Sequence, residues 1–187
     1  MKRIATSSFL LFTFCCVSCS DLKNRKSDHQ ILTDEALSKV YEEVASKRFA
    51  YENSPINNFN VNGSLLTDIV KSPVLIFRFS ETNCQDCVKQ VAESLVKNFS
   101  KKSDKILILG SFSSDRSLML YLKSLNLDHF KWLNVPKGSV SNYLDIENIP
   151  YLFILNQKLL IDNLFIPHYK LSNLTGIYIN TISQRLK

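Results

Sequence analysis

The stretch PVLIFRFSETNCQDCVKQV, residues 73–91, joins an apolar run to a polar turn with two cysteines and then to a second apolar pattern. The run Val74–Phe79 is almost continuously apolar, which is typical of a strand in a parallel sheet that is covered on both faces. After Cys87, apolar residues recur at the spacing of a helix face: Val88, Val91, Ala92, Leu95, Val96 and Phe99. The stretch therefore predicts a buried strand, a short loop and a helix that opens at Cys84 and Cys87.

The rest of the chain predicts strands and helices in alternation. Before the cysteines we expect a helix over 32–50, a short strand and turn over 56–66, and a brief helix that stops before Pro73. After them we expect a strand over 105–112, a helix over 113–127, an extended segment over 130–135, a helical turn over 138–146, a hairpin of strands 151–156 and 159–166, and a closing helix over 171–186 with Leu174, Ile177, Tyr178 and Ile182 facing inward. This order predicts an α/β sandwich with a mixed sheet, because the first crossovers are parallel and the hairpin is antiparallel.

The first residues predict export. Lys2 and Arg3 precede a short apolar run, Phe9–Val17, which is well below the roughly 20 residues that span a bilayer and is typical of a signal peptide. The following VSCS resembles a bacterial lipobox, in which the peptidase cuts before a cysteine that becomes lipidated, here Cys19. We therefore expect a signal peptide over 1–18, a tether over 19–31, and a domain over 32–187. The alternative is an ordinary secretory signal, cut near Ser18 or Ser20.

Cleavage would leave few cysteines with a structural purpose. Of the 5 cysteines in the chain, Cys15 and Cys16 would leave with the signal peptide and Cys19 would be capped by lipid. Cys84 and Cys87 then remain, and a disulfide that closes so short a loop constrains the unfolded chain only weakly. A structural role as a staple is therefore a weak explanation for Cys84 and Cys87.

Three uses of a C-x-x-C pair can be compared. A structural zinc site needs about four ligands, and this chain has no second pair and only 3 scattered histidines, so we expect no metal and no cofactor. An inert buried pair would not explain why both cysteines open a helix. In the redox interpretation, the unpaired N–H groups and the dipole of the helix N-terminus favour a thiolate at the first cysteine.

The net charge of the chain is +6. Its basic residues are not clustered with interleaved aromatic residues as they are in a nucleic-acid site, so we do not expect nucleic-acid binding.

The same stretch resembles the strand, loop and helix at the active site of the thioredoxin fold. Residues 62–84, NGSLLTDIVKSPVLIFRFSETNC, resemble the lead-in of the TlpA-like branch of exported thiol-disulfide oxidoreductases. The resemblance covers roughly Ile56 to Leu186. It implies a thioredoxin-like three-layer sandwich with a mixed central sheet and a C-terminal β-hairpin plus helix. It also implies that Cys84 and Cys87 are catalytic.

Two further features belong to the resemblance. The family carries a cis-proline before its antiparallel strand, which corresponds to Pro150, and the backbone of the residue before it, Ile149, would line a groove for an extended substrate. The departures from the family are Asn83, where an aromatic residue is usual, Arg78, where a buried acid or amide is usual, and the dipeptide Gln85-Asp86 between the cysteines. Arg78, Gln85 and Asp86 are therefore candidates for tuning the pair. Arg78 would either extend its head to solvent or lie buried as a cation beneath the site.

These observations predict an exported, lipid-anchored enzyme that exchanges disulfides with cysteine-containing envelope proteins or another redox partner. It would lie in the bacterial cell envelope and face the periplasm or the outside. We expect Cys84 to be the exposed attacking sulfur and Cys87 to be buried in the first turn, where it resolves the mixed disulfide. The alternative is a thioredoxin-like binding module with weak or no redox turnover. A peroxidase is a weaker alternative, because its single reactive cysteine with a neighbouring threonine and distant arginine is not evident.

Overall fold

The computed structural model describes residues 39, 42, 45, 46, 53–61, 64–140, 143–147 and 149–186. The predicted signal peptide, the lipidation site Cys19 and the tether lie outside the described residues, as does the predicted inward face of the helix over 32–50. Lys39, Glu42, Ala45 and Ser46 are helical and exposed. Among the described residues, no helix is both long and apolar enough to cross a membrane.

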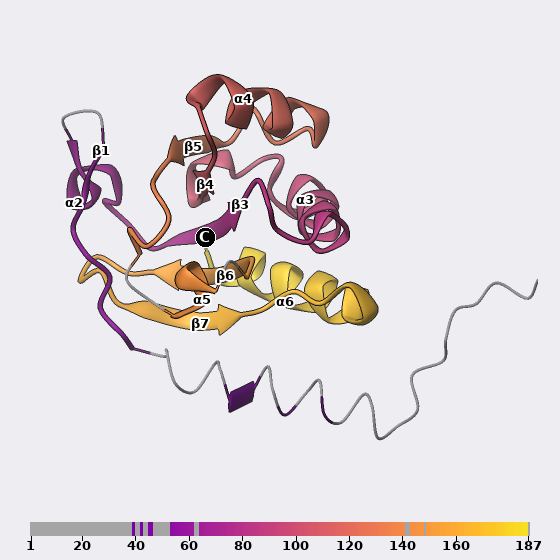
Figure 1. Cartoon of the computed structure of the whole chain (residues 1–187). Helices are drawn as coiled ribbons and strands as arrows, with labels where there is room; N and C mark the ends of the chain where they lie inside the picture. The colour runs from indigo at the N-terminus through magenta and orange to yellow at the C-terminus, as the bar shows by residue number, and fades with distance from the viewer. Residues whose placement is uncertain are drawn as a thin grey trace, which may run out of the picture. The chain divides into compact units, whose positions relative to one another are not determined.

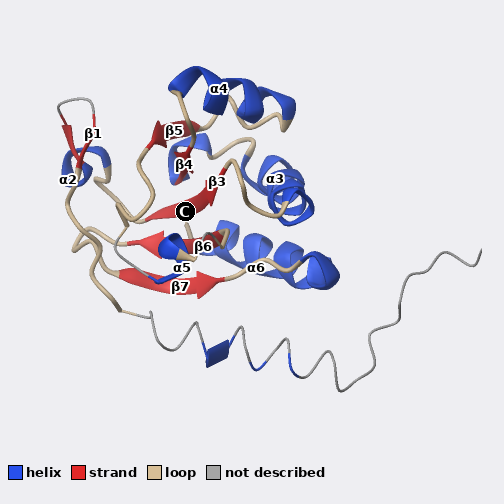
Figure 2. Ribbon diagram, viewed as in Figure 1, coloured by secondary structure: helices blue, strands red, loops and turns tan. Residues whose placement is uncertain are grey.

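The described strands and helices alternate as the sequence predicts. Their order is β1 (Asn60–Val61), β2 (Ser64–Leu65), α2 (Leu66–Ile69), β3 (Val74–Ser80), α3 (Gln85–Phe99), the 3-10 turn η2 (Ser103–Lys105), β4 (Ile106–Ser111), α4 (Asp115–Ser124), β5 (Lys131–Asn134), α5 (Tyr143–Ile146), β6 (Tyr151–Leu155), β7 (Ile161–Phe165), the 3-10 turn η3 (Tyr169–Leu171) and α6 (Ser172–Arg185). Strands and helices are distinguished in Figure 2.

Five of these strands form one mixed sheet in the order β5-β4-β3-β6-β7. The pairs β3–β4 and β4–β5 are parallel, whereas β6 pairs antiparallel with both β3 and β7. Residues before β1 run along the outer edge of β7, where Asn53 N donates to Ile161 O at 2.8 Å and Ile161 N donates to Ser54 O at 3.0 Å. The predicted mixed sheet with a C-terminal hairpin and helix is therefore confirmed.

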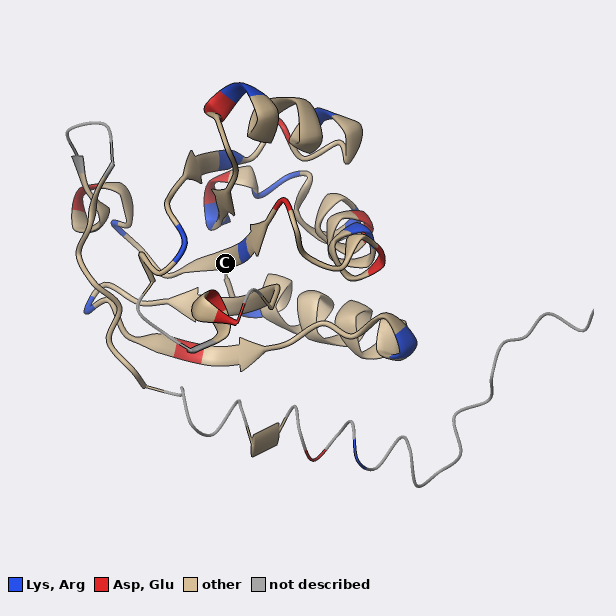
Figure 3. Cartoon of the chain, viewed as in Figure 1, with Lys and Arg blue, Asp and Glu red and all other residues tan. Residues whose placement is uncertain are grey.

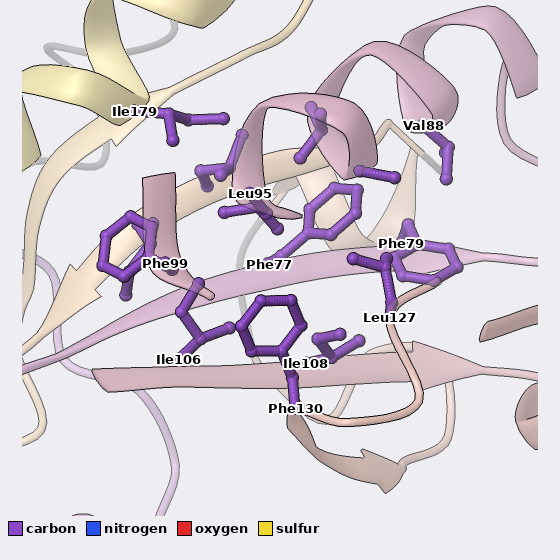
Figure 4. Packing of buried hydrophobic residues seen from close by; sticks show 14 of the residues in the cluster. Phe77, Phe79, Val88, Leu95, Phe99, Ile106, Ile108, Leu127, Phe130 and Ile179 are labelled. Atoms are coloured by element: carbon purple, nitrogen blue, oxygen red, sulfur yellow. The ribbon is translucent and has the colours of Figure 1, made fainter. Parts of the chain in front are cut away.

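Helices cover both faces of the sheet (Figure 1). On one face, Leu75, Phe77 and Phe79 of β3 pack with buried residues of α3, α4 and α6, and Figure 4 shows part of this cluster at close range. On the other face, Val74 and Ile76 pack with buried residues of α2, of α5 and of the segment before α5. The sheet thus forms the middle of three layers, which is the predicted thioredoxin-like α/β sandwich.

The alternation of side chains along β3 determines where its arginine lies. Successive side chains of a strand point to opposite faces, so Phe77 and Phe79 share one face and Val74, Ile76 and Arg78 share the other. Arg78 therefore points into the layer that contains α5. It is the fifth residue of a strand in which all side chains before Ser80 are buried.

The prediction that Ile177 of α6 faces inward is wrong. Ile177 of α6 is 62% exposed, whereas Thr175, Ile179, Ile182 and Ser183 are buried. A helix turns about 100° per residue, so Ile177 lies opposite the face formed by Thr175, Ile179 and Ile182. The spacing of apolar residues predicted the wrong inward face, because two polar side chains, those of Thr175 and Ser183, occupy buried positions on this helix. Leu174 and Tyr178 are half-buried.

Candidate active site

A tight turn delivers the cysteines to the start of α3. The side chain of Asn83 accepts a hydrogen bond from Ser80 N at 2.6 Å, and Asn83 N donates to Ser80 O at 3.2 Å. Asn83 is only 8% exposed. The residue that stands where the family usually has an aromatic side chain is therefore a buried turn former, a role that the sequence analysis did not assign.

Cys84 is the N-cap of α3 and is exposed, whereas Cys87 lies in the first turn and is 5% exposed. The Cys84 sulfur accepts a hydrogen bond from Cys87 N at 3.4 Å, and the two sulfur atoms lie 2.6 Å apart. The predicted difference in exposure between the two cysteines is confirmed. The pair is close enough for one sulfur to attack the other with little movement of the backbone.

The environment of Cys87 keeps its thiol protonated. Burial, followed by the hydrogen bond and the charge of Cys84, raises the pKa of Cys87 to about 12. The Asp86 carboxylate adds a smaller effect in the same direction, and a hydrogen bond from the backbone N–H of Tyr169 opposes them. At neutral pH, Cys87 is therefore a thiol that must lose its proton before it can act as a nucleophile.

Arg78 is buried beneath this turn, with 2% of its surface exposed. Its Nε donates to Asp145 Oδ1 at 2.5 Å, and its guanidinium also donates to the backbone oxygens of Leu109, Val135 and Pro136 at 3.2–3.4 Å. The expectation that Arg78 extends to solvent is thus wrong. The expectation of a buried cation is correct, but the cation is neutralised by a carboxylate that the sequence analysis did not identify.

Asp145 in turn organises the segment that precedes α5. Its second oxygen accepts hydrogen bonds from Gly138 N at 2.6 Å and from Val140 N at 3.5 Å. Gly138 has a φ of +84°, a backbone conformation that glycine adopts without the strain that other residues incur. The ion pair therefore ties β3 to the loop after β5 and to α5.

A small cavity of about 10 Å³ connects the ion pair with the cysteine turn. Its walls include Arg78 and Asp145 of the ion pair, Ser80 and Asn83 of the turn, and Ile149. Its volume is close to the minimum that holds one water molecule. The structure thus brings Ile149, one of the two predicted groove residues, next to the turn that carries Cys84.

Pro150, the second predicted groove residue, is buried, but it does not have the expected backbone conformation. The peptide bonds of the described residues are all trans, including that between Ile149 and Pro150. The prediction of a cis-proline is therefore wrong. The two isomers of an X–Pro bond differ by only about 0.5–1 kcal/mol, so the dipeptide alone does not decide between them. Here Ile149 N donates to Leu144 O at 3.0 Å, and the chain enters β6 directly after Pro150.

The dipeptide between the cysteines faces solvent. Gln85 and Asp86 are both exposed, at the first two positions of α3. Asp86 also borders an open groove of about 370 Å³, whose other walls are formed by Lys89, Gln90, Glu93 and Tyr169. Helix α3, which supplies four of these five residues, carries charges of both signs (Figure 3). The groove is thus of mixed charge and lies beside the cysteine pair.

Sequence reasoning missed the contacts made by η3. The side chain of Gln90 donates to Tyr169 O at 2.9 Å, and Tyr169 N donates to the Cys87 sulfur. Nothing in the sequence near Tyr169 marks it as a neighbour of the cysteines.

In the part of the chain that the structure describes, no three His, Cys, Asp or Glu side chains cluster in a way that could hold a metal ion.

Comparisons with known proteins find similarity in backbone structure. No protein-family model matches the chain, and no curated protein matches it either. Among solved structures, a thiol:disulfide interchange protein from Bacteroides sp. is 16% identical over 70% of this chain and 90% of its own, with a TM-score of 0.47. A putative thiol:disulfide interchange protein DsbE from Chlorobium tepidum is 14% identical over 69% and 96%, with a TM-score of 0.48. Peroxidoxin BcpB from Mycobacterium tuberculosis is 13% identical over 71% and 97%, with a TM-score of 0.49.

The chemistry of the site follows from its own atoms. An exposed sulfur at a helix N-terminus is accessible to a disulfide from outside, and a second sulfur within 2.6 Å can displace whatever becomes attached to it. The N–H groups of the first helical turn favour negative charge at the N-cap position. This arrangement suits the formation and the breaking of a disulfide between Cys84 and Cys87.

Proposed function

We propose that the chain is a thiol-disulfide oxidoreductase of the TlpA-like branch that uses Cys84 as the attacking sulfur and Cys87 as the resolving sulfur. The observation that carries this proposal is the exposed N-cap sulfur of Cys84 beside the buried sulfur of Cys87. The first sulfur is accessible to a partner protein, and the second is accessible only from within the protein.

The exchange proceeds in two displacements. The Cys84 thiolate attacks one sulfur of a partner disulfide, so that a Cys84–partner bond forms and the other partner sulfur leaves as a thiolate that takes a proton from water. Cys87 then releases its proton to solvent and attacks the Cys84 sulfur, which forms the Cys84–Cys87 disulfide and frees the second partner thiolate. Two electrons pass from the dithiol to the partner, and the reverse sequence oxidises a partner dithiol.

The test is the reduction of insulin by dithiothreitol with and without the protein. We expect the chain to accelerate the reaction and the Cys84→Ser/Cys87→Ser variant to leave it at the uncatalysed rate. Equal rates with both proteins would favour the second candidate, a thioredoxin-like binding module. The pKa of about 12 at Cys87 is the observation that favours this second candidate, because a protonated resolving thiol slows turnover.

The proposal extends to location and partners. The basic residues Lys2 and Arg3, the short apolar run Phe9–Val17 and the lipobox-like VSCS support export and lipidation at Cys19, and thus membrane attachment in the cell envelope. The partners would then be cysteine-containing envelope proteins. Incorporation of labelled palmitate tests the anchor: label that disappears in a Cys19→Ala variant supports it, and equal labelling of both proteins, or none of either, contradicts it.

A further inference from the structure

The second cysteine receives a hydrogen bond from a distant part of the chain. Tyr169, the first residue of η3, lies in the connection between β7 and α6, and its backbone N–H donates to the Cys87 sulfur. A hydrogen bond of this kind stabilises a sulfur anion more than a neutral thiol. The connection between β7 and α6 therefore takes part in the electrostatics of the cysteine pair.

The position of that N–H depends on a side chain of α3. Gln90, one helical turn after Cys87, donates from Nε2 to Tyr169 O at 2.9 Å. A carbonyl oxygen can only accept, so the amide nitrogen must face it and the orientation of the Gln90 amide is determined by its neighbour. The two hydrogen bonds hold Tyr169 at both ends, its N–H against Cys87 and its C=O against Gln90.

One end of the Gln90 side chain destabilises the folded state. Its Oε1 atom is buried and has no hydrogen-bond partner within the described part of the chain. A buried acceptor without a partner destabilises the folded state, and an apolar side chain of the same length would avoid that cost. The hydrogen bond that Gln90 donates from Nε2 is thus the interaction that can offset this loss of stability.

We propose that Gln90 is a positioning residue for disulfide exchange, which holds η3 so that the Tyr169 N–H faces the Cys87 sulfur as that sulfur gains or gives up negative charge. The inference rests on the proposed function. In the second displacement, Cys87 loses its proton and its electron pair forms the bond to the Cys84 sulfur. In the reverse direction, a partner thiolate attacks Cys84 and Cys87 leaves with that electron pair. The Tyr169 N–H favours the anionic Cys87 sulfur in both directions.

The two displacements can be observed separately. The protein for this experiment is the full chain with Cys15, Cys16 and Cys19 replaced by serine, so that Cys84 and Cys87 are its only thiols. The reduced protein is mixed with one equivalent of a symmetric nitrobenzoate disulfide, whose thiolate product is coloured. A first release of colour reports attack by Cys84, and a second release reports attack by Cys87 on the resulting mixed disulfide.

In this background, Gln90→Met removes the donor and keeps the length of the side chain. Loss of a hydrogen bond to a charged group is expected to raise the pKa of Cys87 by about one unit. The second release should then become about threefold slower at neutral pH, because a tenfold smaller thiolate fraction is partly offset by the greater nucleophilicity of the more basic thiolate. Its pH profile should shift upward, while the first release keeps its rate. Gln90→Glu, which has the same shape without the donor, should slow the second release as well.

The matched control is Gln157→Met. Gln157 also donates from Nε2 to a backbone oxygen, that of Lys71 at 2.7 Å, but in the turn between β6 and β7, at the other end of the sheet. Gln157→Met should therefore leave the rates of both releases unchanged. The inference is overturned if the second release of Gln90→Met and Gln90→Glu keeps the rate and pH profile of the parent, or if the two releases slow equally. A parent protein that gives no second release would instead contradict the proposed function.

Discussion

Arg78 and Asp145 lie 67 positions apart in the chain and meet as an ion pair whose side chains are 2% and 4% exposed. Each partner is held by further hydrogen bonds: Arg78 donates to three backbone oxygens, and Asp145 accepts from Gly138 N and Val140 N. The pair places no net charge beneath the cysteine turn. Arg78 therefore acts on the site by holding its surroundings together rather than as an isolated cation that attracts a thiolate.

Replacing Arg78 alone should destabilise the fold strongly. Arg78→Met leaves the Asp145 carboxylate buried without its partner, and removing one member of a buried pair costs about 3–5 kcal/mol. The double variant Arg78→Met/Asp145→Leu removes both charges and should recover much of that loss. Chemical denaturation of the three proteins measures the free energies of unfolding.

A surface pair gives the control for this experiment. Lys71 and Asp68 lie 3.5 Å apart with side chains that are 73% and 60% exposed, and such pairs contribute about 0–1 kcal/mol. Lys71→Met should therefore be nearly neutral. If Arg78→Met costs no more than Lys71→Met, or if the double variant is as unstable as the single one, the ion pair does not hold the site together.

The strands were predictable because their signals are local. The apolar run of β3 is one continuous stretch, and the apolar runs of β6 and β7 are separated by a short turn. The C-x-x-C spacing is likewise confined to four residues. The partner of Arg78 was not predictable, because nothing near either residue in the sequence indicates that they meet. The same holds for Tyr169 and Cys87, which the connection between β7 and α6 brings together. Ile177 was misplaced because buried polar residues hide the true period of α6.

The turn before the cysteines should be sensitive to the loss of one acceptor. Asn83→Ala removes the oxygen that accepts from Ser80 N and leaves that N–H without this partner, at a cost of about 1–3 kcal/mol. Asn83→Asp keeps an acceptor and should retain most of the stability. Because the turn positions Cys84, the rate of alkylation of Cys84 by iodoacetamide should change in Asn83→Ala and much less in Asn83→Asp.

A similar loss at the far end of the sheet provides the comparison. Asn156 Oδ1 accepts from Lys158 N at 2.9 Å and from Leu160 N at 3.1 Å in the turn between β6 and β7. Asn156→Ala should lower the stability without altering the alkylation of Cys84. Equal alkylation rates in Asn83→Ala and Asn156→Ala would show that the Asn83 turn does not position the cysteine.

The stability of the reduced protein should fall at alkaline pH. The pKa of Cys87 is raised from 9.0 to about 12 in the fold, so between these values the unfolded chain has lost a proton that the folded chain retains. The unfolded state is then favoured as the pH rises, by up to about 1.4 kcal/mol per pH unit. Below pH 9 both states are protonated and this contribution to the pH dependence vanishes.

The measurement compares two proteins, because other groups also titrate in this range. Denaturation of the reduced chain and of Cys87→Ser at several pH values between 8 and about 11 gives the difference that belongs to Cys87. We expect the two curves to be parallel below pH 9 and the reduced chain to lose stability faster above it. Parallel curves throughout would mean that the fold does not raise the pKa of Cys87.

The two cysteines should differ most clearly in what they trap. Cys84 is the exposed N-cap sulfur and Cys87 is buried behind it, so a partner disulfide can reach Cys84 first. Cys87→Ser keeps the attacking sulfur and removes the resolving one, so mixed disulfides with partner proteins should accumulate on Cys84. Cys84→Ser should trap none, because Cys87 is shielded and its burial, the largest cause of its raised pKa, remains in this variant. Mass spectrometry of envelope proteins, alkylated immediately after lysis, identifies the trapped species. Partners bound to Cys87 in the Cys84→Ser protein would reverse the assignment of roles, and the absence of partners in both variants would favour a binding module over an oxidoreductase.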